Sequence, residues 1–148
     1  MLYEAAFWRT EERNLSLTQM LADDHLRRYV DGWGCPSDIG VIAEDDGKTP
    51  VGAAWFRLFT AKRPGYGFID GATPEVSIAV KQNRRGIGIG TALLQHLLED
   101  ATTARIPALS LSVSAENPAL HLYERAGFVK VKRIEGSWTM RCRLRNPD

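Results

Sequence analysis

The sequence predicts an α/β fold of the α+β type, in which helices cover both faces of one mixed, mostly antiparallel sheet. Three observations favour this fold. Strand-like apolar segments recur between residues 39 and 144, a helical pattern precedes them, and another begins directly after a glycine-rich turn at residues 83–90. With 148 residues, 44% of them hydrophobic, the chain can bury one substantial core and has little room for a second domain.

Two helices are expected before the first strand. Residues 2–13 show an amphipathic pattern, and Ser16 or Thr18 can cap a second helix whose apolar positions extend to Val30. Glycine and proline at residues 32–36 end this helix.

A hairpin and a loop are expected next. The strand-like segments 39–44 and 51–59 flank Asp45-Asp46-Gly47-Lys48, a turn composition typical of an antiparallel hairpin. Residues 63–74 are rich in glycine and proline, and we expect them to form a loop.

The second half is expected to complete the sheet. A strand ends at Val80, and after the glycine turn a long helix packs an apolar stripe on the sheet, formed by Ile89, Leu93, Leu97 and Ala101. Residues 108–113 are predicted to be a buried strand parallel to the strand before the turn. Segments 129–133 and 137–144 should form a closing hairpin around Glu135-Gly136.

Composition argues against several classes of function. A net charge of +1, from 19 basic and 18 acidic residues, gives no support to a nucleic-acid surface. Cys35 and Cys142 match no disulfide framework or zinc motif, and the three histidines show no metal-ligand spacing, so no metal is expected. No segment has the pattern of a membrane span or a signal peptide, and a reducing cytoplasm is the expected location.

The glycine turn is the strongest indication of a binding site. Gly86, Gly88 and Gly90 lack a Cβ, so the backbone can adopt positive φ and approach a ligand closely. The first amides of the helix that follows have no intrahelical partner and carry the positive end of its dipole. The expected ligand is a phosphate or pyrophosphate.

Three phosphate-binding patterns can be compared with this turn. A Walker loop needs a lysine after its last glycine, but Thr91 and Ala92 follow Gly90. A dinucleotide-binding fingerprint needs an acidic residue at the end of the next strand, and that strand ends in Ser114, with Glu116 abutting a helix start. The third pattern is an arginine or glutamine, two residues, a glycine, one residue and a glycine, which residues 85–90 match.

Two segments together resemble the GNAT superfamily of acyl-CoA-dependent N-acetyltransferases. Residues 85–90 resemble its pyrophosphate loop, and residues 117–128 resemble its second motif, in which Asn117 begins a short helix, Tyr123 lies on its second turn and Gly127-Phe128 close it. Local chemistry also explains Asn117 as an N-cap, Pro118 as the first helical residue and Gly127 as the left-handed residue after the helix. The resemblance covers roughly the C-terminal half of the chain.

The resemblance implies acetyl-CoA as co-substrate and an amine as acceptor. It implies that the cofactor is bound by the strand before the turn, the turn itself and the second motif, that is by Ile78, Ala79, Val80, Arg85, Gly86, Ile87, Gly88, Ile89, Gly90, Thr91, Asn117 and Tyr123. A main-chain amide within residues 78–80 would stabilise the charged thioester oxygen, and Asn117 would hold the pantetheine arm.

The resemblance also implies two catalytic side chains. An alkylamine must lose a proton before it attacks, and Glu75, acting through a water, is the expected base, with Asp70 in reserve. An ordinary solvent-exposed glutamate at a strand end is the structural alternative for Glu75. Tyr123 resembles the general acid that protonates the leaving thiolate, and a half-buried core tyrosine is its structural alternative.

The chain departs from the family at its start, because the strand that usually precedes the first helix is not evident. We expect residues 1–148 to form a single domain, with 1–73 mainly on the acceptor side, 74–128 carrying the cofactor motifs and 129–148 forming the closing hairpin. A homodimer is compatible with this organisation.

The acceptor is the least determined part. Trp33 and Tyr66 lie in glycine-rich loops and are the best candidates to line an acceptor pocket. A near-neutral chain without an acidic cluster favours a small amine, with a peptide or protein amine as the alternative. A non-catalytic acyl-CoA sensor or regulatory module is the alternative from another class of function.

Overall fold

The computed structural model describes residues 16–145, so the predicted helix over residues 2–13, and the question of a strand before it, lie outside the described residues. Along the chain the described elements are α2 (Leu17–Ala22), α3 (Asp24–Arg27), β1 (Ile39–Glu44), β2 (Pro50–Arg57), β3 (Glu75–Val80), the 3-10 helix η2 (Gln82–Arg84), α4 (Ile89–Thr103), β4 (Ala108–Ser114), α5 (Ala119–Arg125), β5 (Val129–Ile134) and β6 (Ser137–Arg143).

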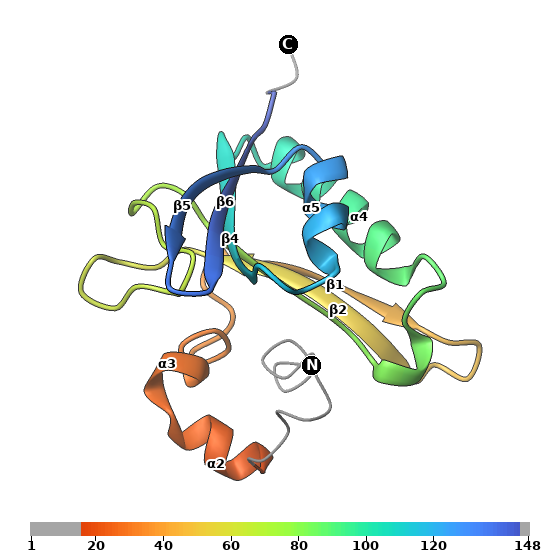
Figure 1. Ribbon diagram of the computed structural model, residues 1–148. Helices are drawn as coiled ribbons and strands as arrows, with labels where there is room; N and C mark the ends of the chain where they lie inside the picture. The colour runs from red at the N-terminus through yellow and green to blue at the C-terminus, as the bar shows by residue number, and fades with distance from the viewer. Residues whose placement is uncertain (1–15, 146–148) are drawn as a thin grey trace.

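These strands form one six-stranded sheet in the order β1-β2-β3-β4-β6-β5. Only β3 and β4 run parallel, because α4 lies in the connection between them, and the other neighbours are antiparallel. The predicted mixed, mostly antiparallel sheet is confirmed. Figure 1 shows the two hairpins, β1/β2 and β5/β6, towards opposite ends of the sheet.

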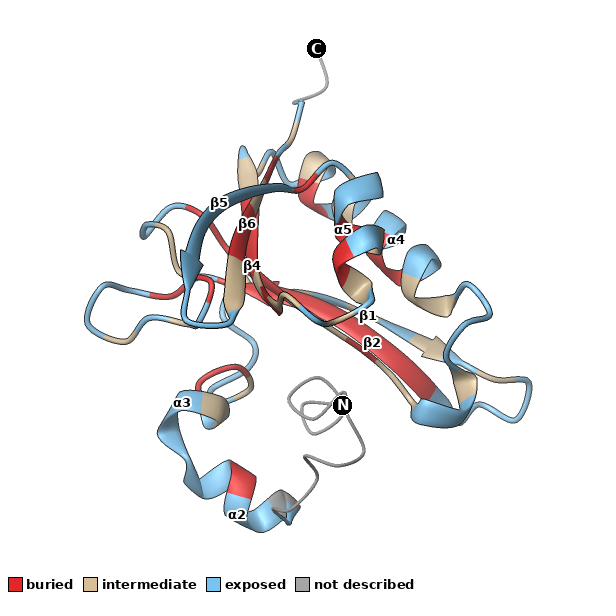
Figure 2. Ribbon diagram, in the orientation of Figure 1, coloured by how far each residue is buried: buried red, intermediate tan, exposed pale blue. Residues whose placement is uncertain are grey.

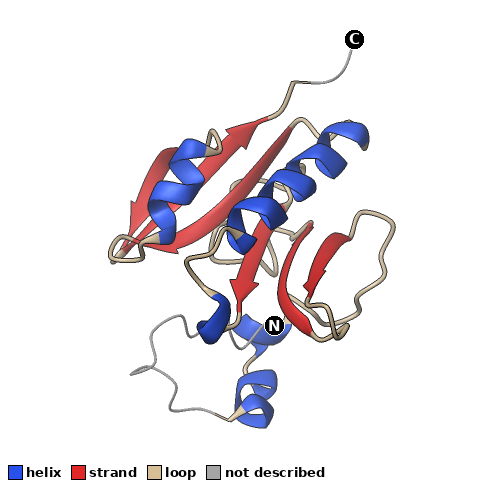
Figure 3. Cartoon of the chain, turned by 90° about the vertical axis from the view of Figure 1, so that its right-hand side faces the viewer, coloured by secondary structure: helices blue, strands red, loops and turns tan. Residues whose placement is uncertain are grey.

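Two cores lie on the two faces of the sheet, and β2 contributes to both. Ala54 and Phe56 pack towards α4 and α5, whereas Ala53 and Trp55 point to the other face, where Met20 is also buried. Figure 2 shows β2 as an almost continuous buried strand in the middle of the molecule. Figure 3 views the sheet from the side on which α4 and α5 lie in front of the strands. The expected helices on both faces are therefore confirmed.

The long helix after the turn packs as its sequence predicts. Leu93, Leu94, Leu97 and Ala101 of α4 are buried, at the spacing of one helical face. Leu97 is fully buried, and truncating such a leucine to alanine costs about 2–5 kcal/mol. This packing fixes the direction of α4 and hence the position of its first turn.

The second predicted helix is wrong in one respect, because it is interrupted at Asp23. Ser16 caps α2 with a reciprocal capping box to Gln19, and the main chain turns to an extended conformation at Asp23. The Asp23 carboxylate then accepts from the amide of His25 at 2.9 Å and starts α3. An aspartate in this place satisfies the orphan amides of a new helix instead of continuing the previous one.

Candidate active site

A cleft opens in the sheet between β3 and β4. Within the described sheet, Glu75 and Ser110 are the single residue pair that joins these strands, and the Ser110 amide donates to the carbonyl of Pro74 at 2.9 Å. Beyond this pair, β3 keeps its pairing with β2 and β4 keeps its pairing with β6, so the strands diverge. The cleft has a volume of about 1000 Å³, which is at the upper end for ligand pockets.

The divergence leaves one edge of β3 free to bind a ligand. The amide of Lys81 donates to Val51 of β2 at 2.8 Å, and successive residues of an antiparallel strand alternate in the direction of their main-chain groups. The amides of Ile78 and Val80 therefore face the cleft. The amide of Ala79 faces β2, so Ala79 contributes to the cleft wall but is not directed to donate to an oxyanion there.

The glycine turn lies at one end of the cleft. Gly86 and Gly88 have φ of 78° and 91°, a left-handed conformation that glycine adopts without strain. Gly88 is the N-cap of α4, and Ala92 donates to its carbonyl at 3.1 Å, so the amides of residues 89–91 precede the first intrahelical bond. These amides and the helix dipole are suited to bind an anion at the cleft.

The other turn residues contribute in different ways. Arg85 lines the cleft and its Nε donates to the carbonyl of Val80 at 3.0 Å, which holds the guanidinium beside the free edge of β3. Ile87 is 68% exposed and Ile89 packs against the core under α4, and neither side chain lines the cleft. Ile87 and Ile89 can therefore serve a ligand only through the main chain.

Tyr123 and Asn117 form the opposite wall. Tyr123 is buried on α5 with its ring edge-on to Phe128, and burial raises its pKa, so the hydroxyl stays protonated at neutral pH. The Asn117 side chain accepts from the amide of Ala119 at 2.9 Å, but the helix starts one residue later than predicted, with Pro118 as its N-cap. Asn117, Pro118 and Tyr123 all line the cleft.

Glu75 lies at the vertex where β3 and β4 meet, and it is buried instead of being an exposed strand-end residue. Its Oε1 accepts from the hydroxyl of Tyr29 at 2.9 Å and from the amide of Gly67 at 2.7 Å, while its Oε2 is buried without a partner. Burial raises the pKa of Glu75 to about 7, against the opposing effect of these two donors. A carboxyl that titrates near neutral pH is suited to general base catalysis.

Asp70 is not placed to share this role. Its carboxylate accepts from the amide of Ala72 and the hydroxyl of Thr73, both at 2.9 Å, and these bonds lower its pKa. It is exposed and is absent from the cleft lining. The structure thus favours Glu75 over the reserve candidate.

Only one of the two predicted acceptor aromatics reaches the cleft. Tyr66 lines it and stacks on Tyr29 with ring centroids 6.3 Å apart. Trp33 does not line the cleft. Its ring lies beside Gly40 of β1, and the guanidinium carbon of Arg57 lies 5.7 Å from the centroid of that ring. We therefore leave Trp33 out of the acceptor site.

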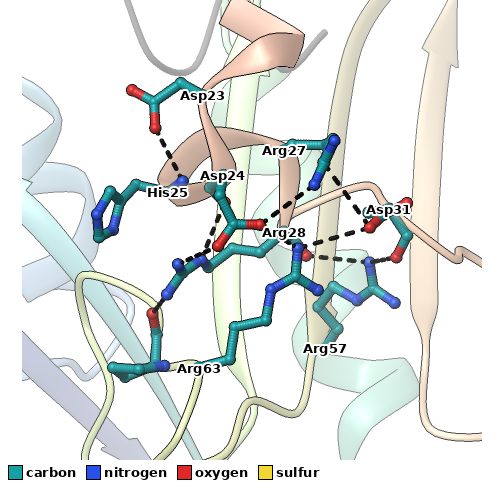
Figure 4. A network of polar contacts seen from close by, with 9 residues as sticks. Asp23, Asp24, His25, Arg27, Arg28, Asp31, Arg57 and Arg63 are labelled. Atoms are coloured by element: carbon teal, nitrogen blue, oxygen red, sulfur yellow. Dashed lines mark hydrogen bonds and ion pairs between the residues drawn. The ribbon is translucent and has the colours of Figure 1, made fainter.

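A network of ion pairs ties α3 to the loop that carries Tyr66 (Figure 4). Asp24 pairs with Arg28 and Arg63, each at 2.7 Å, and these two partners, Arg63 foremost, lower the pKa of Asp24 to about 2. Arg28 also donates to the carbonyl of Pro64. The end of the cleft at which Tyr66 lies is thus bounded by two segments that are held together by charge.

Sequence reasoning missed several cleft residues. Leu26 and Tyr29, interpreted only as apolar helix positions, line the cleft, as do the strand residues Ser77 and Ser112. Ser77 follows Glu75 by two residues and so shares its face, but only the open side of β3 reveals that this face is functional.

Comparison with known proteins decides the family. The model of the acetyltransferase (GNAT) family matches residues 5–128, which is most of the chain. The chain belongs to the GNAT family. The glycine turn and the tyrosine on α5 lie within the matched residues.

Individual GNAT relatives differ in the acceptors they name. A mycothiol acetyltransferase from Propionibacterium freudenreichii is 30% identical, with 79% of this chain and 36% of that protein covered. The structure of ribosomal-protein-alanine N-acetyltransferase from Brucella melitensis is 30% identical with a TM-score of 0.58, covering 71% of this chain and 68% of that one. A phosphinothricin acetyltransferase from Sinorhizobium meliloti in complex with AcCoA, 24% identical with a TM-score of 0.58 over 71% and 60%, shares the fold.

The chain spans 33% to 52% of the length of the curated relatives that it matches. Between residues 16 and 145, no helix is long and apolar enough to cross a membrane. The same described range contains no group of three or more histidine, cysteine, aspartate or glutamate side chains that could hold a metal ion.

Proposed function

We propose that this GNAT domain transfers an acetyl group from acetyl-CoA to an amine, with Glu75 as base and Tyr123 as acid. The observation that carries the proposal is the cleft itself. A single opening in the sheet joins an anion-binding helix start, a free strand edge, a buried carboxyl that titrates near pH 7 and a tyrosine hydroxyl.

The cleft residues fit acetyl-CoA along its length. The amides at the start of α4 and the side chain of Arg85 suit the pyrophosphate, and the free edge of β3 together with Asn117 suits the amide groups of the pantetheine arm. Bound acetyl-CoA supplies an activated thioester. The cleft would place that thioester between β3 and α5.

Glu75 is proposed to take the proton of the acceptor amine through a water. An alkylamine with a pKa near 10 is almost wholly protonated at neutral pH and attacks only as the free base. The carboxylate of Glu75 and the free edge of β3 lie on the same strand, so the base is carried by the element that would bind the thioester.

The charge that develops on the acetyl oxygen would be stabilised by the amide of Ile78 or Val80, which face the cleft. Tyr123 would protonate the departing thiolate. Because burial raises the pKa of Tyr123, its hydroxyl carries the proton needed for this step throughout the neutral range.

The acceptor is proposed to be a small amine with some apolar surface. Leu26, Tyr29 and Tyr66 give the acceptor end a largely apolar and aromatic lining beside one acidic residue, Asp23, and an ion pair between Asp24 and Arg63 ties α3 to the loop at this end. A peptide or protein amine is the second candidate, and the acceptors named for the relatives do not choose between the two.

The test is incubation with acetyl-CoA and a panel of amines, amino acids and short peptides while free thiol is measured. Steady thiol release above the buffer rate with one acceptor class supports the proposal and identifies the class. Saturable binding of acetyl-CoA without thiol release from any acceptor would support the alternative, a non-catalytic acyl-CoA sensor.

A further inference from the structure

The two oxygens of Glu75 have unlike surroundings. Oε1 receives two hydrogen bonds, from the Tyr29 hydroxyl at 2.9 Å and the Gly67 amide at 2.7 Å. Oε2 is buried and has no hydrogen-bond partner. This asymmetry determines which oxygen carries the proton when the carboxyl is neutral. It also indicates that Tyr29 orients the carboxyl.

The direction of the hydrogen bond from Tyr29 is fixed by its other partner. The Tyr29 oxygen accepts from the amide of Tyr66 at 2.7 Å, so its own proton is directed to Oε1 of Glu75. The amide of Gly67 is likewise a donor, so Oε1 accepts both of its hydrogen bonds. A proton bound by Glu75 therefore lies on Oε2.

Tyr29 is held in place by several contacts besides its hydrogen bond to Glu75. Its carbonyl accepts from the indole of Trp55 at 3.1 Å, its ring meets Phe59 edge-on with centroids 5.1 Å apart, and it stacks on Tyr66. These contacts come from β2, from the segment after β2 and from the 63–67 loop. The carboxyl thus takes its orientation from the tyrosine.

Two glycines allow the loop to complete this arrangement. A Cβ on Gly65 would lie 1.8 Å from Oε2 of Glu75, and a Cβ on Gly67 would lie 2.5 Å from the main chain of Leu111 in β4. Only glycine lets the loop lie this close to the carboxyl and to β4.

We propose that Tyr29 is the positioning residue for the base: its hydroxyl, together with the amide of Gly67, holds Oε1 of Glu75 and so fixes the orientation of the carboxyl. The proposal rests on the function proposed above only in naming Glu75 as the base. Because the bond favours the charged carboxylate, its removal should make Glu75 harder to ionise.

The groups around the carboxyl are few. The turn after α3 contributes the phenol of Tyr29, and the loop contributes Tyr66. The adjoining strand β4 contributes the non-titrating Ser110, with Arg141 of β6 next in the same row. On the other side, β2 contributes Arg57, the antiparallel partner of Glu75, whose guanidinium pairs with Asp38. Arg28 faces Asp24 and the carbonyl of Pro64 instead.

The experiment follows the carboxyl directly, by carbon-13 NMR of the full chain labelled at glutamate Cδ. Glu75→Gln identifies the Glu75 signal. Tyr29→Phe should raise the pKa of that signal by about one to two units, the shift that corresponds to losing one hydrogen bond to a charged group. Tyr66→Phe, which removes a neighbouring hydroxyl but keeps the backbone donor to Tyr29, should leave the titration unchanged.

A second variant should shift the pKa of Glu75 in the opposite direction. Difluorotyrosine at position 29 keeps the hydroxyl and makes it a stronger donor, so it should lower the pKa of Glu75, and it serves also if Tyr29→Phe does not fold. In acetyl transfer, the acid limb of the kcat/KM profile should move with the carboxyl in each variant.

The outcomes separate the two proposals. An unchanged Glu75 titration in folded Tyr29→Phe, or a fall in rate with no movement of the acid limb, would overturn the positioning role. A shifted titration in a protein that transfers no acetyl group to any acceptor would support the positioning role and overturn the proposed function.

Discussion

Glu75 and Ser110 are directly paired across β3 and β4, and in the described sheet they are the last point of contact before these strands separate. The proposed base therefore lies at the vertex of the cleft. Its burial, which raises its pKa, is a consequence of that position, because the loop over residues 65–67 covers the vertex.

This burial predicts how stability depends on pH. The folded pKa of Glu75 is raised to about 7 from 4.5, so between these values the folded state keeps a proton that the unfolded state has released. The free energy of unfolding should fall as pH rises through this window, by about 3 kcal/mol in all at about 1.4 kcal/mol per unit. Glu75→Gln should remove this slope in urea unfolding at pH 5, 6, 7 and 8.

Asp70→Asn is the matched control for the stability measurement. The pKa of Asp70 is lowered, so its contribution is present above its unfolded pKa and is lost only as pH falls through the folded value. The slope between pH 5 and 8 should survive in this variant. A wild-type slope that persists in Glu75→Gln would show that Glu75 is not its source.

The glycine turn predicts a charge-dependent loss of CoA binding. A Cβ on Gly90 would lie 3.6 Å from Leu122 and 3.8 Å from Val80, ordinary contact distances, so side chains there should not disturb the fold. Gly90→Glu places a negative charge at the helix start, whereas Gly90→Gln adds nearly the same shape without charge. Calorimetry should show CoA affinity at least about 10-fold lower for Glu than for Gln.

Equal affinities for the two Gly90 variants would mean that the pyrophosphate does not lie at these amides. Thermal unfolding of both variants checks the fold. An acidic residue in the first turn of a helix is, if anything, favourable to the helix.

The sequence predicted the elements of residues 74–128 well, because their signals are local. Glycine spacing, the apolar stripe from Leu93 to Ala101 and the turn at Gly127 each depend on a few neighbouring residues, and the structure confirms these elements. The helix break at Asp23 was missed because one capping aspartate competes with an otherwise continuous apolar pattern.

The part of the chain before β3 was predicted less well, because its geometry depends on distant segments. Tyr29 meets Glu75 across 46 positions, and nothing near either residue indicates the contact. Trp33 and Tyr66 have similar glycine-rich surroundings in the sequence, yet only Tyr66 lines the cleft, whereas Trp33 lies beside β1 at Gly40. Local composition indicates exposure, not which part of the sheet a loop covers.

This difference gives a matched pair of variants for the acceptor site. Tyr66→Ala removes an aromatic wall of the cleft and should weaken apparent binding of the best amine by about 1–3 kcal/mol, the scale of a buried aromatic contact, with CoA binding unchanged. Trp33→Ala removes an aromatic side chain that also lies in a glycine-rich loop but outside the cleft. The KM of this variant for the amine should stay at the wild-type value. The measurement is KM for the amine at saturating acetyl-CoA. Identical KM values for wild type and Tyr66→Ala would remove Tyr66 from the acceptor site.

Tyr123→Phe tests the proposed acid, because it keeps the ring that packs against Phe128 and removes only the hydroxyl. If Tyr123 protonates the leaving thiolate, kcat should fall about 10²-fold while the dissociation constant for CoA stays nearly constant. Phe128→Leu is the control for packing: it loosens the same contact and should lower stability, but it keeps the hydroxyl and should largely keep kcat. Single-turnover rates should be compared as well, because slow product release can hide a slower chemical step. A Phe variant with the wild-type single-turnover rate across the pH range would show that Tyr123 only fills the core.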